Sequence, residues 1–182
     1  MNKKKIIMKR LLIILVFFII RCDSGLSERN NTPQMNVETL SIGDKFPGFK
    51  EFNVCDNENV GYDYNDTSKV ILLSLFTSWW SVCQAHVSSL ETLHQNYNNQ
   101  GLIVIAAGKD MGNPYTCEEW TTTFGASYLI INDNSLAIEQ QFSLDGIVPY
   151  YVIIDKTRII RYSSSGFEQS ELESLIQTVL DE

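Results

Sequence analysis

The chain has 182 residues, enough for one ordinary domain with a short appendage. Residues 1–21 hold six of its 14 Lys and Arg residues and no acid, which leaves eight basic against 22 acidic residues, a net charge of −14, in the remainder. Such an acidic surface repels phosphate backbones and argues against nucleic-acid binding. Two histidines eight residues apart and four scattered cysteines form no metal-ligand pattern, and no cofactor is predicted.

Residues 1–21 have the layout of an export signal. The basic "MNKKKIIMKR" precedes ten apolar residues, "LLIILVFFII", a run too short to span a bilayer. Cys22 follows directly after Arg21, at the position where a bacterial lipoprotein is lipidated, although small residues are expected before that cysteine. Lipidation of Cys22, ordinary signal cleavage and an uncleaved anchor all stay open. We expect an exported protein, tethered through residues 22–39 to the periplasmic or cell-surface side of a bacterial membrane.

Residues 40–182 alternate between predicted strands and helices. A leading loop and short strand at 42–54 precede the turn-rich segment 55–69, which predicts a hairpin. The continuous apolar run at 70–76 predicts a buried strand, and apolar residues at helical spacing predict a helix over 81–97. Further strands are predicted at 102–107, 128–131, 149–155 and 158–162, and further helices at 116–125, 135–142 and 170–180. This order predicts an α/β domain with a mixed sheet.

Two of the predicted helices carry capping residues at their starts. Thr116 can cap the helix that Gly125 ends, and Ser170 and Glu173 have the spacing of a capping box.

The segment "LFTSWWSVCQAHVSSLETL" joins the first buried strand to the first long helix. Without a gap, it resembles the active-site segment of the membrane-anchored TlpA/ResA-type branch of the thioredoxin superfamily, allied to the AhpC/TSA redoxins, which reads roughly "FWATWCPPCRAEMPALEKL". Trp79 falls on the tryptophan of that pattern, Trp80 on its first cysteine and Cys83 on its second. The chain therefore has WxxC where the family has CxxC.

A second segment, "FSLDGIVPYYVIIDKTRIIRY", resembles the family's "YGVRGVPTTFLIDKDGRIV". It places Pro149 on the cis-proline that faces the active site, with Val148 before it. The resemblance covers about residues 40–182. It implies a thioredoxin-like fold, with a central mixed sheet flanked by helices and an N-terminal extension hairpin, and a cis Val148–Pro149 bond packed against the Trp80–Cys83 turn.

Thiol–disulfide oxidoreductases of this family need both cysteines. The first sits at a helix N-terminus, where the helix dipole favours a thiolate, and attacks a substrate disulfide. The second resolves the mixed disulfide and releases the product. Trp80 cannot become a thiolate, so the sequence predicts that the ordinary dithiol cycle is lost.

One interpretation of the site is a binding module without enzymatic activity. Trp79 and Trp80 would then form an aromatic face together with Val148 and Pro149. The partner would be an extended peptide or a protein.

Two other interpretations keep thiol chemistry at Cys83, with a protein thiol or disulfide as the partner. Cys83 could act alone, with His86 one helical turn further helping to ionise it. Cys117 could instead resolve Cys83 in a peroxiredoxin-like or rewired cycle, although the proline and threonine of the peroxiredoxin loop are missing. Cys55 could also pair with Cys117, and spacing alone does not decide between these pairings.

Overall fold

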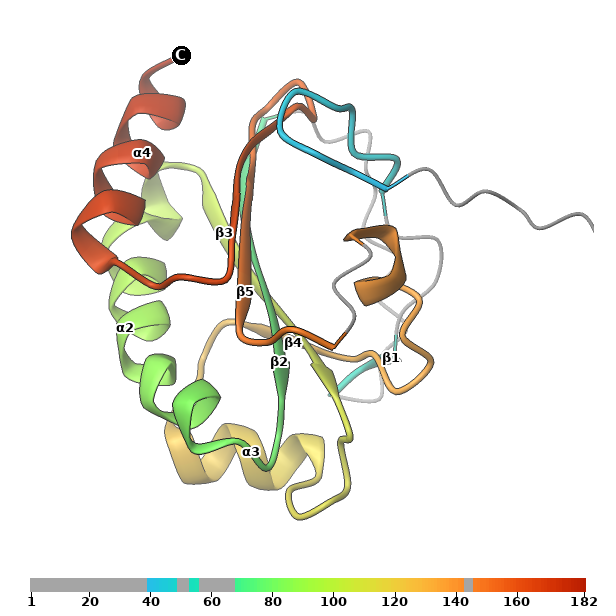
Figure 1. Ribbon diagram of the computed structural model, residues 1–182. Helices are drawn as coiled ribbons and strands as arrows, with labels where there is room; N and C mark the ends of the chain where they lie inside the picture. The colour runs from blue at the N-terminus through green and yellow to red at the C-terminus, as the bar shows by residue number, and fades with distance from the viewer. Residues whose placement is uncertain (1–38, 49–52, 56–67, 143–145) are drawn as a thin grey trace, which may run out of the picture. The chain divides into compact units, whose positions relative to one another are not determined.

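The computed structural model describes residues 39–48, 53–55, 68–142 and 146–182, all within one compact unit, Val37–Glu182. The predicted export segment, with Cys22, and nearly all of the predicted tether lie outside the described residues. The described chain forms a six-stranded mixed sheet in the order β1-β4-β3-β2-β5-β6 (Figure 1). The strands are β1 (Asn53–Val54), β2 (Val70–Thr77), β3 (Leu102–Lys109), β4 (Leu129–Asn132), β5 (Tyr150–Ile154) and β6 (Ile160–Ser164). The helices are α2 (Ser81–Tyr97), α3 (Cys117–Phe124) and α4 (Gln169–Asp181), with short 3-10 helices η1 (Asn98–Gln100) and η2 (Glu139–Phe142).

The centre of the sheet is the pair β2 and β3, which run parallel in register from Val70↔Leu102 to Thr77↔Lys109. Every residue of β2 is buried, as its continuous apolar run predicts for a strand covered on both faces. On its other side β2 pairs antiparallel with β5, whose Tyr150 lies opposite Leu75. The loop before β5 therefore lies at the end of the sheet where β2 and β3 finish.

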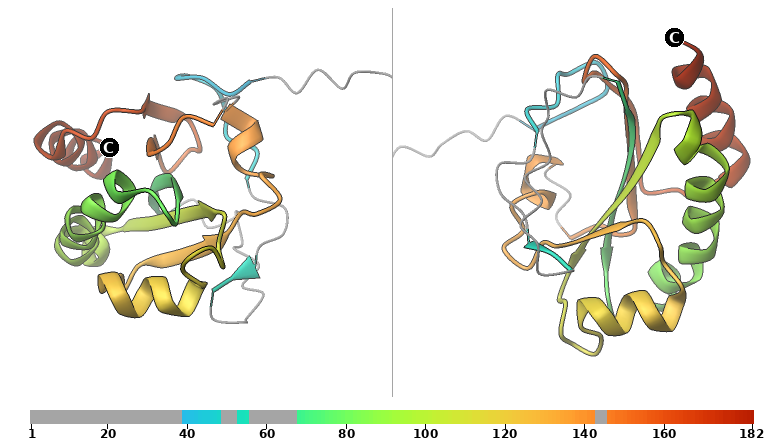
Figure 2. Two further views of the ribbon diagram at one scale, coloured as in Figure 1. Left: turned by 60° about the horizontal axis from the view of Figure 1, so that its bottom comes forward. Right: turned by 180° about the vertical axis from the view of Figure 1, so that it is seen from behind.

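The helices cover the sheet unequally. α2 and α4 lie over one face and η2 lies over the other (Figures 1 and 2), while α3 contacts β4 and α2. The buried side chains of α2 recur at helical spacing, as predicted; they are Cys83, Val87, Leu90 and Leu93. The predicted thioredoxin-like fold with its mixed sheet is confirmed.

The start of α3 follows the prediction. The Thr116 side chain accepts a hydrogen bond from the Glu119 backbone N–H at 3.2 Å, the Glu119 carboxylate accepts from the Thr116 backbone N–H at 2.9 Å, and Gly125 ends the helix with a φ of 70°.

Two helix predictions were wrong in detail. α4 begins at Gln169 after an extended Glu168, so Ser170 lies inside the helix and cannot cap it. The segment 135–142 forms only the short helix η2, and the buried Asp133 carboxylate accepts hydrogen bonds from the backbone N–H groups of Ile138 and Glu139 where it begins.

At the edge of the sheet, β1 pairs antiparallel with β4 through two residue pairs, Asn53↔Asn132 and Val54↔Ile131. Most of the hairpin predicted at 55–69 lies outside the described residues. Among the helices of the described part, none is long and apolar enough to cross a membrane.

Candidate functional site

The turn between β2 and α2 is held by Asp110, the residue that follows β3. The Asp110 Oδ2 accepts hydrogen bonds from Thr77 Oγ1 and from Trp79 Nε1, both at 3.0 Å. The Ser78 hydroxyl lies 2.9 Å from the Asp110 carbonyl oxygen and 3.0 Å from that of Asn113. Because three consecutive residues of the turn are bonded to one loop, the turn and the ring of Trp79 are fixed in place.

Two tryptophans project from this turn into solvent. Trp79 is 55% exposed and Trp80 is 38% exposed. Their rings stack nearly in parallel, with centroids 6.0 Å apart and an interplanar angle of 8°. Val82 on the first turn of α2 and Ile147 before β5 are also exposed apolar residues at this end of the sheet. We call Trp79, Trp80, Val82 and Ile147 the tryptophan face.

Trp80 is the N-cap residue of α2, and its side chain makes no capping hydrogen bond. Cys83 lies one turn into the helix and is buried, with 4% of its surface exposed. Burial raises the pKa of the Cys83 thiol, although a backbone hydrogen bond at Thr77 and the charge of Lys109 act to lower it. A thiol in this state is a poor nucleophile at neutral pH.

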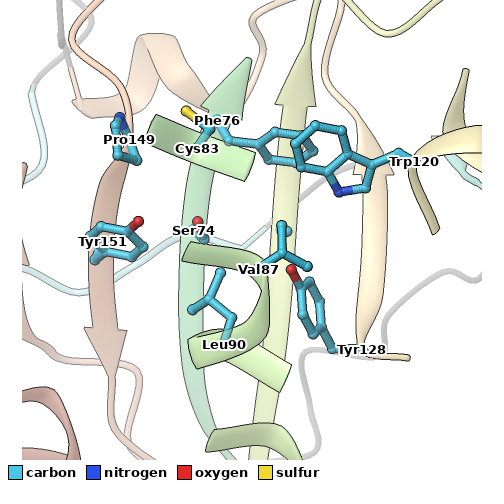
Figure 3. Close-up of a pocket in the computed structure, with 10 residues that line it drawn as sticks. Ser74, Phe76, Cys83, Val87, Leu90, Trp120, Tyr128, Pro149 and Tyr151 are labelled. Atoms are coloured by element: carbon cyan, nitrogen blue, oxygen red, sulfur yellow. The ribbon is translucent and has the colours of Figure 1, made fainter. Parts of the chain in front are cut away.

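Cys83 and Pro149 line the same small cavity beneath the turn (Figure 3). Its volume is about 10 Å³, room for about one water molecule. The Val148–Pro149 peptide bond is cis, as the resemblance implied, and both residues are buried. The predicted cis bond is therefore confirmed, and Pro149 lies beside Cys83 of the predicted Trp80–Cys83 turn.

His86 is engaged by aromatic residues. Its Nδ1 lies 2.7 Å from the hydroxyl of Tyr151, and its ring stacks on Phe167 with centroids 4.6 Å apart. Burial lowers the pKa of His86, and burial followed by the nearby Cys83 charge raises the pKa of Tyr151. A neutral imidazole bonded to a phenol gives little help in ionising Cys83.

Cys117, the first residue of α3, forms a disulfide with Cys55, and the two Cα atoms are 5.0 Å apart. The bond links the segment after β1 to α3 across 62 residues of sequence. Among the described cysteines, Cys83 is the free thiol.

A buried ion pair lies behind the turn. Lys109, the last residue of β3, places its Nζ 2.9 Å from Glu139 Oε2 and 3.0 Å from Oε1. The carboxylate of Asp133 accepts a hydrogen bond from the backbone N–H of Glu139, and burial raises the pKa of Asp133. The opposite charges of Lys109 and Glu139 cancel, so the pair adds almost no net charge to this end of the sheet.

Sequence reasoning did not find Asp110 or the Lys109–Glu139 pair. A signal was available, because "GKD" directly follows the apolar run of a parallel strand, and polar residues at the carboxyl ends of parallel strands commonly build sites. No group of three or more His, Cys, Asp or Glu side chains in the described residues is arranged to hold a metal ion.

The comparison with protein families places residues 42–163 in the profile of the AhpC/TSA family. No curated protein matches the chain at a significant level.

Solved structures share the fold. A thiol:disulfide interchange protein assigned as DsbE from Chlorobium tepidum is 20% identical, with a TM-score of 0.68 over 78% of this chain and 99% of its own. A protein assigned as a disulfide isomerase from Bacteroides thetaiotaomicron is 21% identical, with a TM-score of 0.67 over 79% of this chain and 92% of its own. A secreted disulfide oxidoreductase of Mycobacterium tuberculosis is 13% identical, with a TM-score of 0.58 over 70% and 94%.

Proposed function

Because the chain belongs to the AhpC/TSA family, we propose that it is an exported, membrane-tethered thioredoxin-like protein that has lost the dithiol cycle and binds an extended polypeptide at the tryptophan face. The observation that carries the proposal is the indole of Trp80 at the N-cap of α2, exposed and stacked on Trp79. In the sequence match, this is the position of the attacking cysteine.

The state of the remaining thiol supports the loss of the cycle. Thiol–disulfide exchange begins with a thiolate that can reach the substrate. Cys83 is buried and its pKa is raised, so it lacks both properties. A rewired cycle that uses Cys117 would require its disulfide with Cys55 to open first.

The surroundings of the turn support binding. Exposed large apolar side chains concentrated at one end of a sheet are typical of interaction surfaces, and tryptophan contributes strongly to them. The Val148–Pro149 loop lies beside the same turn, and we expect an extended chain to pair with the backbone of this loop. The hydrogen bonds of Asp110 hold Trp79 in place before binding, which lowers the entropic cost of association.

Two features support export. Residues 1–21 have the order of a signal segment, and disulfides such as Cys55–Cys117 persist in oxidising compartments outside the cytoplasm. The tether is either a lipid on Cys22 or an uncleaved anchor. In the native host, the protein should then fractionate with membranes, and intact Met1 in a soluble cytoplasmic fraction would contradict export.

A binding experiment with the full chain in nonionic detergent tests the proposed function. The chain has three tryptophans, so labelling them with ¹⁵N gives three indole signals. A blocked neutral peptide, Gly-Ser-Gln-Val-Thr-Val-Gln-Ser-Gly, should shift the signals of Trp79 and Trp80 and leave that of the buried Trp120 in place. The wild type should also fail to reduce insulin with dithiothreitol above background.

Matched variants make the test specific. Trp79→Ala and Ile147→Ala should each lower the affinity for the peptide about threefold or more. Ile42→Ala should not, because Ile42 is as exposed as Ile147 but lies in the segment that pairs with residues 158–160 at the opposite end of the sheet. Insulin turnover by the wild type that disappears in Cys83→Ser would overturn the proposal in favour of thiol chemistry.

A further inference from the structure

We propose that the polypeptide bound at the tryptophan face is basic, with an arginine or lysine flanking its apolar part. This inference rests on the proposed function, since it names the class of ligand for the same surface. It follows from the distribution of charge along the strands and from the position of one carboxylate.

The basic side chains of the described residues are segregated along the sheet. Six are described, and five of them lie at the end where β2 begins; they are Lys45, Lys69, Lys156, Arg158 and Arg161. The register shows this placement, because Ile154 at the end of β5 lies opposite Ile71, and the turn after β5 carries two of the five. The tryptophan face is at the other end, where β2 and β3 finish.

The sixth basic side chain, Lys109, does lie at the tryptophan end, but its charge is neutralised. Both carboxylate oxygens of Glu139 are within 3.0 Å of its Nζ, and the two side chains are only 16% and 10% exposed. A ligand at the surface therefore meets little positive charge from Lys109.

Negative charge at this end is exposed. Asp110 is an exposed residue, and the hydrogen bonds that it accepts from the side chains of Thr77 and Trp79 both go to Oδ2 and not to Oδ1. The loop that begins with Asp110 leads to α3, where Glu118 lies exposed in the first turn. An acidic ligand would be repelled here, whereas a cation would be attracted.

The tryptophans and Asp110 together suit a cation on a long apolar stem. A guanidinium or ammonium group is attracted to the face of an exposed indole, and Trp79 is bonded directly to the carboxylate of Asp110. An arginine could stack on the ring and donate hydrogen bonds to the carboxylate with the same planar group, so arginine should be preferred to lysine.

The test compares three blocked nonapeptides that differ only at two positions. The neutral peptide described above has Gln on both sides of Val-Thr-Val, and the other two have Arg or Glu in its place. Each is titrated into the full ¹⁵N-tryptophan-labelled chain in nonionic detergent at low ionic strength. The Arg peptide should bind about three- to tenfold more tightly than the Gln peptide, and the Glu peptide more weakly than both. The advantage of Arg should shrink as salt is added.

A single substitution isolates the charge of Asp110. Asp110→Asn keeps an oxygen to accept from Thr77 and Trp79, and asparagine tolerates the positive φ of 58° at this position. The variant should lower the ratio of Arg-peptide affinity to Gln-peptide affinity about two- to fivefold, whatever it does to the affinity that the two peptides share. Asp181→Asn removes the same charge at the far end of α4 and should change neither affinity.

The outcomes separate the two proposals. Equal binding of all three peptides, with shifts at Trp79 and Trp80, would overturn the basic ligand and leave the binding function standing. Tighter binding of the Glu peptide would also overturn it. Failure of every peptide to shift either indole would overturn both proposals.

Discussion

The substitution Trp80→Cys should restore thiol–disulfide exchange to the site. It places a second thiol three residues before Cys83, at the N-cap of α2, where unpaired backbone N–H groups and the helix dipole favour a thiolate. We expect the new thiol to have a pKa below the ordinary value of about 8.5 and to form a reversible disulfide with Cys83. The backbone bond from Gln84 N–H to the residue 80 carbonyl does not depend on the side chain.

The variant should still fold. A tryptophan side chain buries about 150–250 Å² when fully enclosed, and Trp80 keeps 38% of its surface exposed. The substitution therefore removes about 120 Å² of buried side-chain area. At about 25 cal/mol/Å², this lowers the free energy of unfolding by at most about 3 kcal/mol. This cost is below the roughly 5–15 kcal/mol by which most domains are stable.

The assay is insulin reduction with dithiothreitol, together with a mass-spectrometric map of the disulfides. Trp80→Ser controls for the loss of the indole, and Trp79→Cys controls for a new thiol one residue out of position. Only Trp80→Cys should give turnover and a disulfide to Cys83. A folded Trp80→Cys protein without turnover would refute the view that the missing thiol alone disables the site.

Three further predictions concern the scaffold. Replacing both Cys55 and Cys117 by serine should lower the free energy of unfolding by about 4 kcal/mol, because the disulfide closes a loop of 62 residues; an unchanged urea midpoint would contradict a structural role. Lys109→Met should lower the free energy of unfolding by about 3–5 kcal/mol, because it leaves the buried Glu139 without its partner. Adding Glu139→Leu to this variant should restore much of the lost stability. Burial raises the pKa of Cys83, so iodoacetamide should alkylate Cys83 slowly at pH 8 in the native protein. The alkylation rate should rise at a higher pH in the native protein than in the urea-unfolded chain. Equal rates for the two states at pH 8 would show an accessible thiolate.

The sequence predicted those elements whose signal is local. The continuous apolar runs of β2 and β3, the helical spacing of α2 and the Thr116 cap each depend on neighbouring residues, and all were found. The strand predicted at 102–107 extends to Lys109, so Gly108 lies inside the strand and does not end it. A Cβ at Gly108 would lie 2.5 Å from the Phe76 ring, so glycine is required there by close packing.

Features that depend on distant partners were missed. Asp110 was unremarked because its role depends on Trp79, 31 residues earlier, reaching the same end of the sheet. The spacing of Ser170 and Glu173 fits a capping box, but the chain enters α4 two residues earlier, in the extended conformation of Glu168. At the candidate site, the sequence drew attention to Trp79, Trp80 and Cys83, whereas the part played by Asp110 and the burial of Cys83 required the fold.

The three tryptophans occupy two optical environments. Trp120 is 1% exposed and packs against Phe76 and Phe124, with ring centroids 4.6 and 4.5 Å apart, whereas Trp79 and Trp80 face water. The emission of Trp120 should be shifted to shorter wavelength and protected from iodide, while that of the exposed pair should be longer in wavelength and readily quenched. One unlabelled sample can then report occupation of the turn and integrity of the core as separate parts of the same spectrum.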